Sequence, residues 1–445
     1  MKRKRTYRSV DVEKVSVERL LPRLEKRVVV AVDVAKERMV AGLADGSGKT
    51  LELVRFSHPR QTMTFVELLL RLRQEGHDVE AVMEPTGVYG DALRFQLRSR
   101  DFAVFQVDPK RVHDSAYVLD GNVSSHDPKS CTLIAFLHAQ GLSRPWRERT
   151  PEERRVRILL KEHQLESKLE MELYNELEAM TSASWPELNA MMQHAVRWPL
   201  ELLARYPSAR AVRDAPSAEV RAHLRKVSCG ALREQRIADV LSTAKTTTGE
   251  PLEAEEERFI ANLCKRLLEQ RDKLSELDKR MSAAAASNEE TRRIREVVGP
   301  AAALALLALV GAPSSYASAG ALEKACGLNL KVRSSGQTRG KLSITKRGPA
   351  RIRQLLYLAA LRFVQDDPLA RAWYEQRSAY KGGMKVKAFV AVMRKLLRAT
   401  YHVARGETFD SAKLFDARRL GAATEAAPTE AAPTETATAT TSSAV

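Results

Sequence analysis

The chain has 445 residues, and 73 Lys and Arg against 56 Asp and Glu give it a formal net charge of +17. This length allows two or three domains with sizeable cores, and so large a positive excess points to a polyanionic partner, with nucleic acid ahead of a membrane surface. A hydrophobic fraction of 44% and a mean hydropathy of −0.34 exclude both a mainly disordered chain and a polytopic membrane protein.

Neither a secretory signal nor a membrane span is expected. The basic residues 1–5 are not followed by an apolar core, and the apolar stretch 297–326 is interrupted by glycines, prolines and Glu323. A bilayer span needs roughly 20 predominantly apolar residues. The four cysteines form no Cys-x-x-Cys pair, which indicates a reducing cytoplasm and argues against a zinc ribbon.

The first part of the chain is predicted to be an α/β domain. Residues 1–27 form a basic, helix-like extension, and residues 28–145 then alternate between strand and helix patterns. The valine-rich run 28–34 is typical of a buried strand. Further strands are expected at 39–44, 51–57, 79–83 and 103–107, and helices at 65–72 and 89–97. Three meandering strands followed by alternating helices and strands are the order found in ribonuclease-H-like domains.

One segment imitates a phosphate-binding P-loop. Residues 42–50 end in Gly-Lys-Thr, but the residue five before Gly48 is Leu43, so the glycine spacing misses by one. A P-loop must also open a helix, whereas a strand pattern follows here. We therefore predict a hairpin turn.

The rest of the chain is expected to be mainly helical. Residues 151–290 form a helical and coiled-coil region, although 181–249 give mixed signals, and residues 295–405 form a second compact, mostly helical domain. Residues 421–445 repeat a five-residue phrase without Lys or Arg and are expected to be disordered.

The clearest periodicity lies within residues 253–286. Apolar residues recur there at alternating steps of three and four, and only Gln270 interrupts them; they are Ile260, Leu263, Leu267, Leu274, Leu277 and Met281. This pattern predicts a coiled coil of about three and a half heptads that pairs chains into a homo-oligomer, a dimer or tetramer. The alternative is a helix packed within its own chain.

Three acidic residues are candidates for chemistry. Asp33 lies inside the first apolar strand, Glu84 ends the fourth, and Asp127 begins a helix-like run with Pro128 at its first position. The first and fourth strands of a ribonuclease-H-like sheet are neighbours, so Asp33 and Glu84 should converge. Three hard oxygen ligands suit Mg²⁺ or Mn²⁺ in phosphodiester cleavage. For each acid alone, a helix cap or a turn residue remains the alternative.

Short motifs in both halves of the chain resemble those of a known family, and they keep the family order. They are Val30-Ala-Val-Asp33-Val-Ala-Lys36, Met83-Glu84-Pro-Thr-Gly-Val-Tyr89 and His126-Asp127-Pro-Lys129, followed by Val298-Gly-Pro-Ala-Ala-Ala303, Cys326-Gly-Leu-Asn329, Arg333-Ser-Ser-Gly336, Lys346-Arg-Gly348 and Leu355-Leu-Tyr-Leu-Ala-Ala360. Together they resemble the DEDD insertion-sequence transposases of the IS110 family, whose members are guided by a bridge RNA. The likeness covers residues 28–140 and 295–405.

The resemblance implies a RuvC-like N-terminal domain and a C-terminal transposase domain with a catalytic serine. That serine maps onto Ser335, which would attack DNA while Asp33, Glu84 and Asp127 hold Mg²⁺ or Mn²⁺. The implied partners are the DNA of the element ends and target, and a guide RNA, in a prokaryotic cytoplasm at the nucleoid. Two positions depart from the family pattern. Ser130 stands where the fourth acid is usual, and Val297 replaces a glycine before Gly299.

Cations surround the candidate serine. The loop 331–341 is rich in Lys and Arg, and the residues expected to bind nucleic acid are Arg333, Arg339, Lys341, Lys346 and Arg347. Without the resemblance, a plain phosphate-binding loop with serine as a turn residue explains this segment. We therefore predict a DNA transposase or recombinase. A metal-dependent, structure-selective nuclease and a catalytically silent nucleic-acid-binding protein remain the alternatives.

Overall fold

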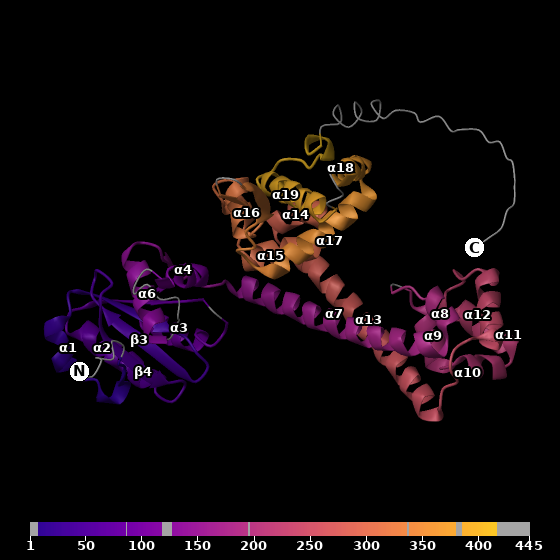
Figure 1. Cartoon of the computed structure of the whole chain (residues 1–445), viewed down its shortest axis with the longest axis horizontal. Helices are drawn as coiled ribbons and strands as arrows, with labels where there is room; N and C mark the ends of the chain where they lie inside the picture. The colour runs from indigo at the N-terminus through magenta and orange to yellow at the C-terminus, as the bar shows by residue number, and fades with distance from the viewer. Residues whose placement is uncertain are drawn as a thin grey trace, which may run out of the picture. The chain divides into compact units, whose positions relative to one another are not determined.

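The computed structural model describes residues 8–85, 87–117, 127–194, 196–335, 338–379 and 385–415, without the side chains of residues 332–341. The chain divides into two compact units, residues 1–148 and 149–445, and each is described by itself (Figure 1). The tail at 421–445, expected to be disordered, lies outside the described residues.

The first unit is built on a seven-stranded mixed sheet of order β1-β4-β3-β2-β5-β6-β7. β2, β5 and β6 run parallel, whereas β3 is antiparallel to both of its neighbours. The strands are β1 (Val10–Asp11), β2 (Arg27–Asp33), β3 (Arg38–Ala44), β4 (Thr50–Ser57), β5 (Asp78–Met83), β6 (Ala103–Gln106) and β7 (Arg144–Pro145). The ribonuclease-H-like α/β class is therefore confirmed, and the Gly42–Thr50 imitation of a P-loop is the turn between β3 and β4.

Helices cover both faces of this sheet (Figure 1). They are α1 (Val17–Leu20), α2 (Thr62–Gln74), α3 (Asp91–Arg98), α4 (Pro109–Asp114) and α6 (Asp127–Ala139). Val30 and Val32 of β2 belong to the core on the side of α2 and α3, whereas Val29 and Ala31 belong to the core beneath α6. Because strand side chains alternate between faces, Asp33 continues the face of Val29 and Ala31.

The start of the chain differs from expectation. Residues 1–27 are predicted to be an extension, yet β1 pairs with β4 and forms the edge of the sheet, and Val12, Val17 and Leu20 are buried in the sheet core. Burying each of these side chains contributes about 1.5–3 kcal/mol. The described part of this segment is therefore integral to the first unit.

Two helices of 34 residues each, α7 (Pro151–Ser184) and α13 (Ala254–Ser287), form the scaffold of the second unit. The start of α7 packs against the end of α13, where Val156 and Leu160 share a core with Leu277 and Met281. The end of α7 packs against the start of α13. The pair is therefore an antiparallel hairpin, about 50 Å long at 1.5 Å per residue.

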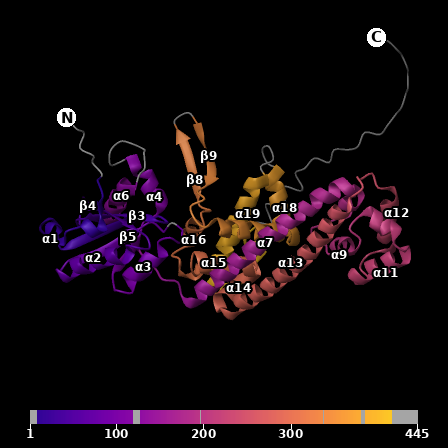
Figure 2. The same cartoon turned by 90° about the horizontal axis from the view of Figure 1, so that it is seen from below.

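Helices attach at both ends of this hairpin, as Figure 2 shows. At one end lie α8 (Pro186–Met191), α9 (Trp198–Arg205), α10 (Ala209–Asp214), α11 (Ser217–Val227) and α12 (Glu234–Thr246), in the segment that the sequence left unassigned. At the other lie α14 (Glu289–Val298), α15 (Pro300–Leu309), α16 (Ala319–Ala325), α17 (Ala350–Asp366), α18 (Pro368–Ala379) and α19 (Lys385–Ala404), with a hairpin of β8 (Leu330–Ser335) and β9 (Thr338–Ile344). The mostly helical C-terminal domain is confirmed. No helix in the described ranges is long and apolar enough to cross a membrane.

The heptad seam of α13 has its partner inside the same chain. Ile260, Leu263 and Leu267 are at most 3% exposed and share a core with residues of α7 and α9, while Leu277 and Met281 pack against the start of α7. The expectation that this seam pairs two chains is therefore wrong, because α7 occupies the face that a second chain would need. The seam forms a coiled-coil-like contact between two helices of one chain.

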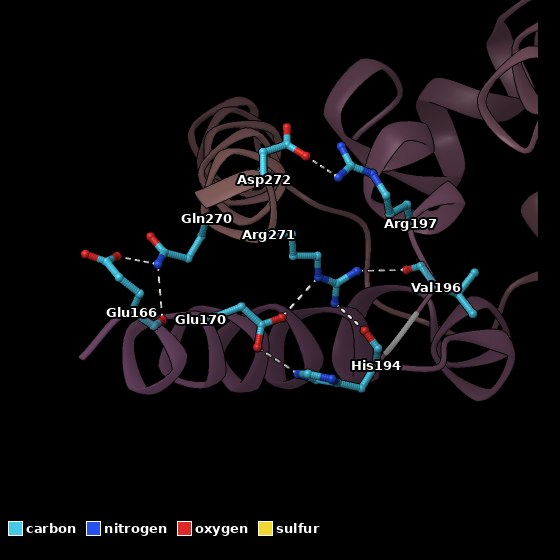
Figure 3. Close-up of polar contacts among 8 residues, drawn as sticks. All are labelled: Glu166, Glu170, His194, Val196, Arg197, Gln270, Arg271 and Asp272. Atoms are coloured by element: carbon cyan, nitrogen blue, oxygen red, sulfur yellow. Dashed lines mark hydrogen bonds and ion pairs between the residues drawn. The ribbon is translucent and has the colours of Figure 1, made fainter. Parts of the chain in front are cut away.

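Polar residues at the middle of the hairpin are matched across the two helices (Figure 3). Gln270, which interrupts the seam, is buried, and its amide donates to the backbone oxygen of Glu166 at 3.1 Å and to the Glu166 carboxylate. Beside it, Arg271 Nε donates to Glu170 at 3.0 Å, and its two terminal nitrogens donate to the carbonyl groups of Val196 and His194. Arg271 therefore ties both long helices to the connection that leads into α9.

Replacing Arg271 by Met should destabilise the second unit strongly. The Glu170 side chain is 6% exposed and that of Arg271 is 12% exposed, so the change removes the guanidinium group and leaves the buried carboxylate with only His194, 2.9 Å away. Breaking such a pair costs about 3–5 kcal/mol in the free energy of unfolding, which urea unfolding of the full chain measures.

A second ion pair between the same two helices supplies the control. Arg280 and Glu162 are 51% and 43% exposed, so Arg280→Gln should cost less than about 1 kcal/mol. Adding Glu170→Leu to Arg271→Met should recover part of the loss, because the stranded charge is removed. Equal losses in Arg271→Met and Arg280→Gln would contradict the assignment.

Candidate functional site

Two of the predicted acids lie at adjacent strand ends in the first unit. β2 and β5 are parallel neighbours, with Val32 opposite Met83, so Asp33 and Glu84 are the next residues at the same level. Neighbouring strands lie about 4.8 Å apart, which brings the two carboxyl groups close together. Val82 and Ala31 share the core beneath α6, so alternation places Glu84 on the same face as Asp33.

The helix α6 brings the third acid and Ser130 to this point. Asp127 is its first residue, and Ser130 follows one turn later. Ser130 donates a hydrogen bond to the Asp33 carboxylate, and the Asp127 charge acts on the same carboxylate. Cys131 fixes the helix against β3, because its buried thiol donates to the Val40 carbonyl at 3.1 Å.

Neighbouring carboxylates and partial burial both disfavour the ionised forms of Asp33 and Glu84. Burial, followed by the charge of Asp127, raises the pKa of Asp33 to about 6, and the bond from Ser130 only partly opposes this. Burial, followed by the charges of Asp33 and Asp108, raises the pKa of Glu84 to about 7. A nearby cation would reverse both shifts.

Asp108 is a member of this cluster that the sequence did not identify. It follows β6, the parallel neighbour of β5, and its side chain caps α4 by accepting from Lys110 N at 2.8 Å. Its position directly after the strand expected at 103–107, like that of Glu84 after its strand, was the available signal. The structure thus adds a carboxylate near Glu84, in a chain that has Ser130 at the position where a fourth acid is usual.

The donors fit a hard divalent cation. Carboxylate and hydroxyl oxygens are what Mg²⁺ and Mn²⁺ prefer, and the raised pKa values of Asp33 and Glu84 mean that a nearby cation would favour their ionised forms. In the described part of the chain, no three His, Cys, Asp or Glu side chains are already arranged around one point as a metal requires. The residues that would hold the ion are Asp33, Glu84 and Asp127, with Ser130 at the fourth position.

The raised pKa values predict how pH and metal affect stability. Between about pH 4 and pH 7, Asp33 and Glu84 hold more protons folded than unfolded, so without metal the free energy of unfolding should fall as pH rises through this window. An ion that binds the ionised folded site adds stability by mass action. Thermal unfolding in EDTA and in MgCl₂ at pH 5 and pH 8 should show a larger Mg²⁺ gain at pH 8.

A matched variant tests whether the site is the cause. Glu52, on β4, pairs with the exposed Arg23, so Glu52→Gln should leave the Mg²⁺ gain intact, whereas Glu84→Gln should reduce it. An equal gain at both pH values, or one that survives Glu84→Gln and Asp33→Asn, would rule out this metal site.

The candidate serine lies in the second unit, on the β-hairpin of β8 and β9, which Figure 2 shows. Ser335 is the last residue of β8 and pairs with Thr338, and Arg333 pairs with Lys341. The ladder is irregular between Arg333 and Ser335. The side chains of Ser335, Arg333, Arg339 and Lys341 lie outside the described residues, so their predicted roles stay predictions.

The base of the hairpin is held by close backbone contact. The Thr345 hydroxyl donates a hydrogen bond to Asn329 Oδ1 at 2.5 Å, and the backbone N–H of Lys346 donates to the Gly327 carbonyl at 3.0 Å. Gly327 has φ +70°, and a Cβ there would lie 2.8 Å from the backbone of Arg347. Gly327 is therefore required where its backbone passes close to that of Arg347. Lys346 and Arg347 themselves are exposed, just beyond the end of β9.

The helix pair that opens the C-terminal domain keeps its turn without the missing glycine. α14 ends at Val298, Gly299 has φ +80°, and Pro300 begins α15. Val297, where the family has glycine, is a buried residue inside α14, 7% exposed. The substitution therefore extends the apolar face of α14, and Gly299 alone supplies the turn.

Family models match both halves of the chain. One, described as the Transposase IS116/IS110/IS902 family, matches residues 295–375, and another, a transposase model for the DEDD domain of IS110, matches residues 30–181. The first covers the hairpin with Ser335, and the second covers Asp33, Glu84, Asp127 and Ser130. A search of curated proteins gives no match.

Proposed function

Because the chain belongs to the IS116/IS110/IS902 family of transposases, enzymes that cut and rejoin DNA, we propose that Ser335 is its nucleophile and that Asp33, Glu84 and Asp127 hold Mg²⁺ or Mn²⁺. The observation that carries the proposal is the acidic site. The charge of Asp127 and the hydrogen bond from Ser130 act on Asp33, the charge of Asp33 acts on Glu84, and the raised pKa values of Asp33 and Glu84 are ones that a divalent cation would lower.

The proposed reaction is a phosphoryl transfer to serine. The Ser335 hydroxyl loses its proton, its oxygen forms a bond to a DNA phosphorus, and the bond from that phosphorus to one deoxyribose oxygen breaks. The released sugar hydroxyl later attacks a phosphoserine link and frees the serine, so the number of phosphodiester bonds is conserved. Arg333, Arg339 and Lys341 are proposed to hold the phosphate, since cations stabilise its developing charge.

The acidic site has a separate task in this scheme. Asp33, Glu84 and Asp127 would hold a divalent ion, which would supply charge neutralisation at a transferring phosphate. Ser130 replaces a charged ligand by a neutral one, so the site has one negative charge fewer than the usual four acids. Asp108, whose charge reaches Glu84, compensates for part of this difference.

Two partners complete the proposal. A structured guide RNA selects the DNA, as the family resemblance implies, and a net charge of +17 suits the binding of both nucleic acids. The protein acts as a homo-oligomer, a dimer or tetramer. Because the α13 seam is occupied within the chain, another surface must join the copies.

Joining of DNA ends tests this function. The DNA that flanks the reading frame is inspected for a structured non-coding segment, which is transcribed and added to the protein with Mg²⁺ and labelled element ends. Joined product is the expected result. Hydrolysed ends without joining would favour the metal-dependent nuclease, and salt-sensitive binding without any product would favour the silent nucleic-acid-binding protein.

A further inference from the structure

A cationic pocket lies between α18 and α19 in the second unit. Its cavity has a volume of about 270 Å³, and the lining residues are Trp373, Arg377, Ala391, Arg394, Lys395 and Arg398. Four of these six side chains are cations.

A single carboxylate organises two of the arginines. Glu323, on α16, is only 3% exposed and accepts from Arg394 at 3.2 and 2.8 Å and from Arg398 Nε at 2.5 Å. Arg394 and Arg398 lie one turn apart on α19, where two like charges repel each other. Glu323 thus fixes both guanidinium groups in place but neutralises only one of them.

The other two cations add charge without adding a carboxylate. Lys395 donates to the Leu414 carbonyl, and its nitrogen lies 5.2 Å from the ring centre of Trp373. Arg377 lies over the same ring at 5.5 Å and, within the described ranges, forms no ion pair with a carboxylate. Burial, followed by the charges of Arg398 and Arg377, lowers the pKa of Lys395. The pocket is therefore a site of unbalanced positive charge.

We propose that this pocket binds one backbone phosphate of a nucleic acid. Its volume lies below the roughly 300–1,000 Å³ of pockets for drug-sized ligands, which suits a phosphodiester group better than a whole nucleotide. Guanidinium groups held in fixed orientations match the oxygens of a phosphate, and among the described residues the terminal nitrogens of the exposed Arg398 have no hydrogen-bond partner. The choice of nucleic acid as the source rests on the proposed function.

The salt dependence of binding tests the pocket. The full chain is titrated by fluorescence anisotropy with a labelled DNA duplex, and separately with a labelled RNA hairpin, over a range of KCl concentrations. The double variant Arg377→Gln and Arg398→Gln retains the Arg394–Glu323 pair and should therefore fold. The slope of log K against log salt should become shallower by about 0.9 if one contact to duplex phosphate is lost.

A variant with the same change of net charge separates a local contact from a general effect. Arg405, at the end of α19, and Lys245, on α12, are both exposed and outside the pocket, so Arg405→Gln with Lys245→Gln should leave the slope nearly unchanged. If the double variant Arg377→Gln and Arg398→Gln has a shallower slope than the parent chain only with the DNA duplex, the phosphate belongs to DNA. If its slope is shallower only with the RNA hairpin, the phosphate belongs to RNA. Slopes that match the control variant with both probes would overturn the proposal. Ser335→Ala should not alter either slope, so failure of the serine assignment would leave this result intact.

Discussion

Replacing Asp33 by Asn, or Glu84 by Gln, should lower DNA cleavage by at least about 10²-fold without lowering the stability of the first unit. Each change removes a charged ligand from the divalent-cation site, and the loss of several kcal/mol of charge stabilisation translates into orders of magnitude in rate. The measurement is single-turnover cleavage of labelled DNA in MgCl₂, with thermal unfolding of the same samples. Asn and Gln keep the size of the side chains, so no cavity is created.

The direction of the stability change makes this test specific. The half-buried carboxyl groups of Asp33 and Glu84 are destabilised when ionised, as their raised pKa values indicate, so removing one charge should stabilise the metal-free protein at pH 8. Glu52→Gln, on the same sheet, should leave cleavage unchanged. Cleavage at the parent rate in both Asp33→Asn and Glu84→Gln would exclude the acidic site from the reaction.

The sheet and its acids could be predicted because their signals are local. The short apolar runs at residues 28–34 and 79–83 are enough to define two strands, and the observed strands begin one residue earlier. Once the strand order is known, Asp33 and Glu84 must meet, because parallel neighbours end at the same edge. Asp127 could be placed because Pro128 marks the start of a helix.

Other features depend on contacts far apart in the sequence. The heptad pattern of α13 shows that one face of the helix is buried but cannot show which segment buries it. That segment is α7, and the contact between Gln270 and Glu166 joins residues 104 positions apart. Glu323 could not be linked to Arg394 and Arg398 for the same reason, since it is 71 and 75 residues away. In each case the local pattern gives the type of contact and the fold alone gives the partner.

Replacing Ser335 by Ala should abolish the covalent DNA–protein adduct and the joining of DNA ends. If the serine oxygen attacks phosphorus, the reaction passes through a phosphoserine link that survives denaturation, and alanine has no atom that can form it. Labelled DNA is incubated with the guide RNA, Mg²⁺ and the protein and then resolved on a denaturing gel. The parent chain should give a labelled band at the mass of protein plus DNA, and Ser335→Ala should give none.

The neighbouring serine provides the matched control, because Ser334→Ala removes the same hydroxyl one residue earlier. The two serines are consecutive residues of β8, so the two variants remove the same group from adjacent positions of one strand. The adduct should survive Ser334→Ala. Its loss there, with Ser335→Ala unaffected, would move the nucleophile by one residue. Cleavage without an adduct in the parent chain would mean that water attacks the phosphate, and the acidic site would then account for the whole reaction as a metal-dependent nuclease.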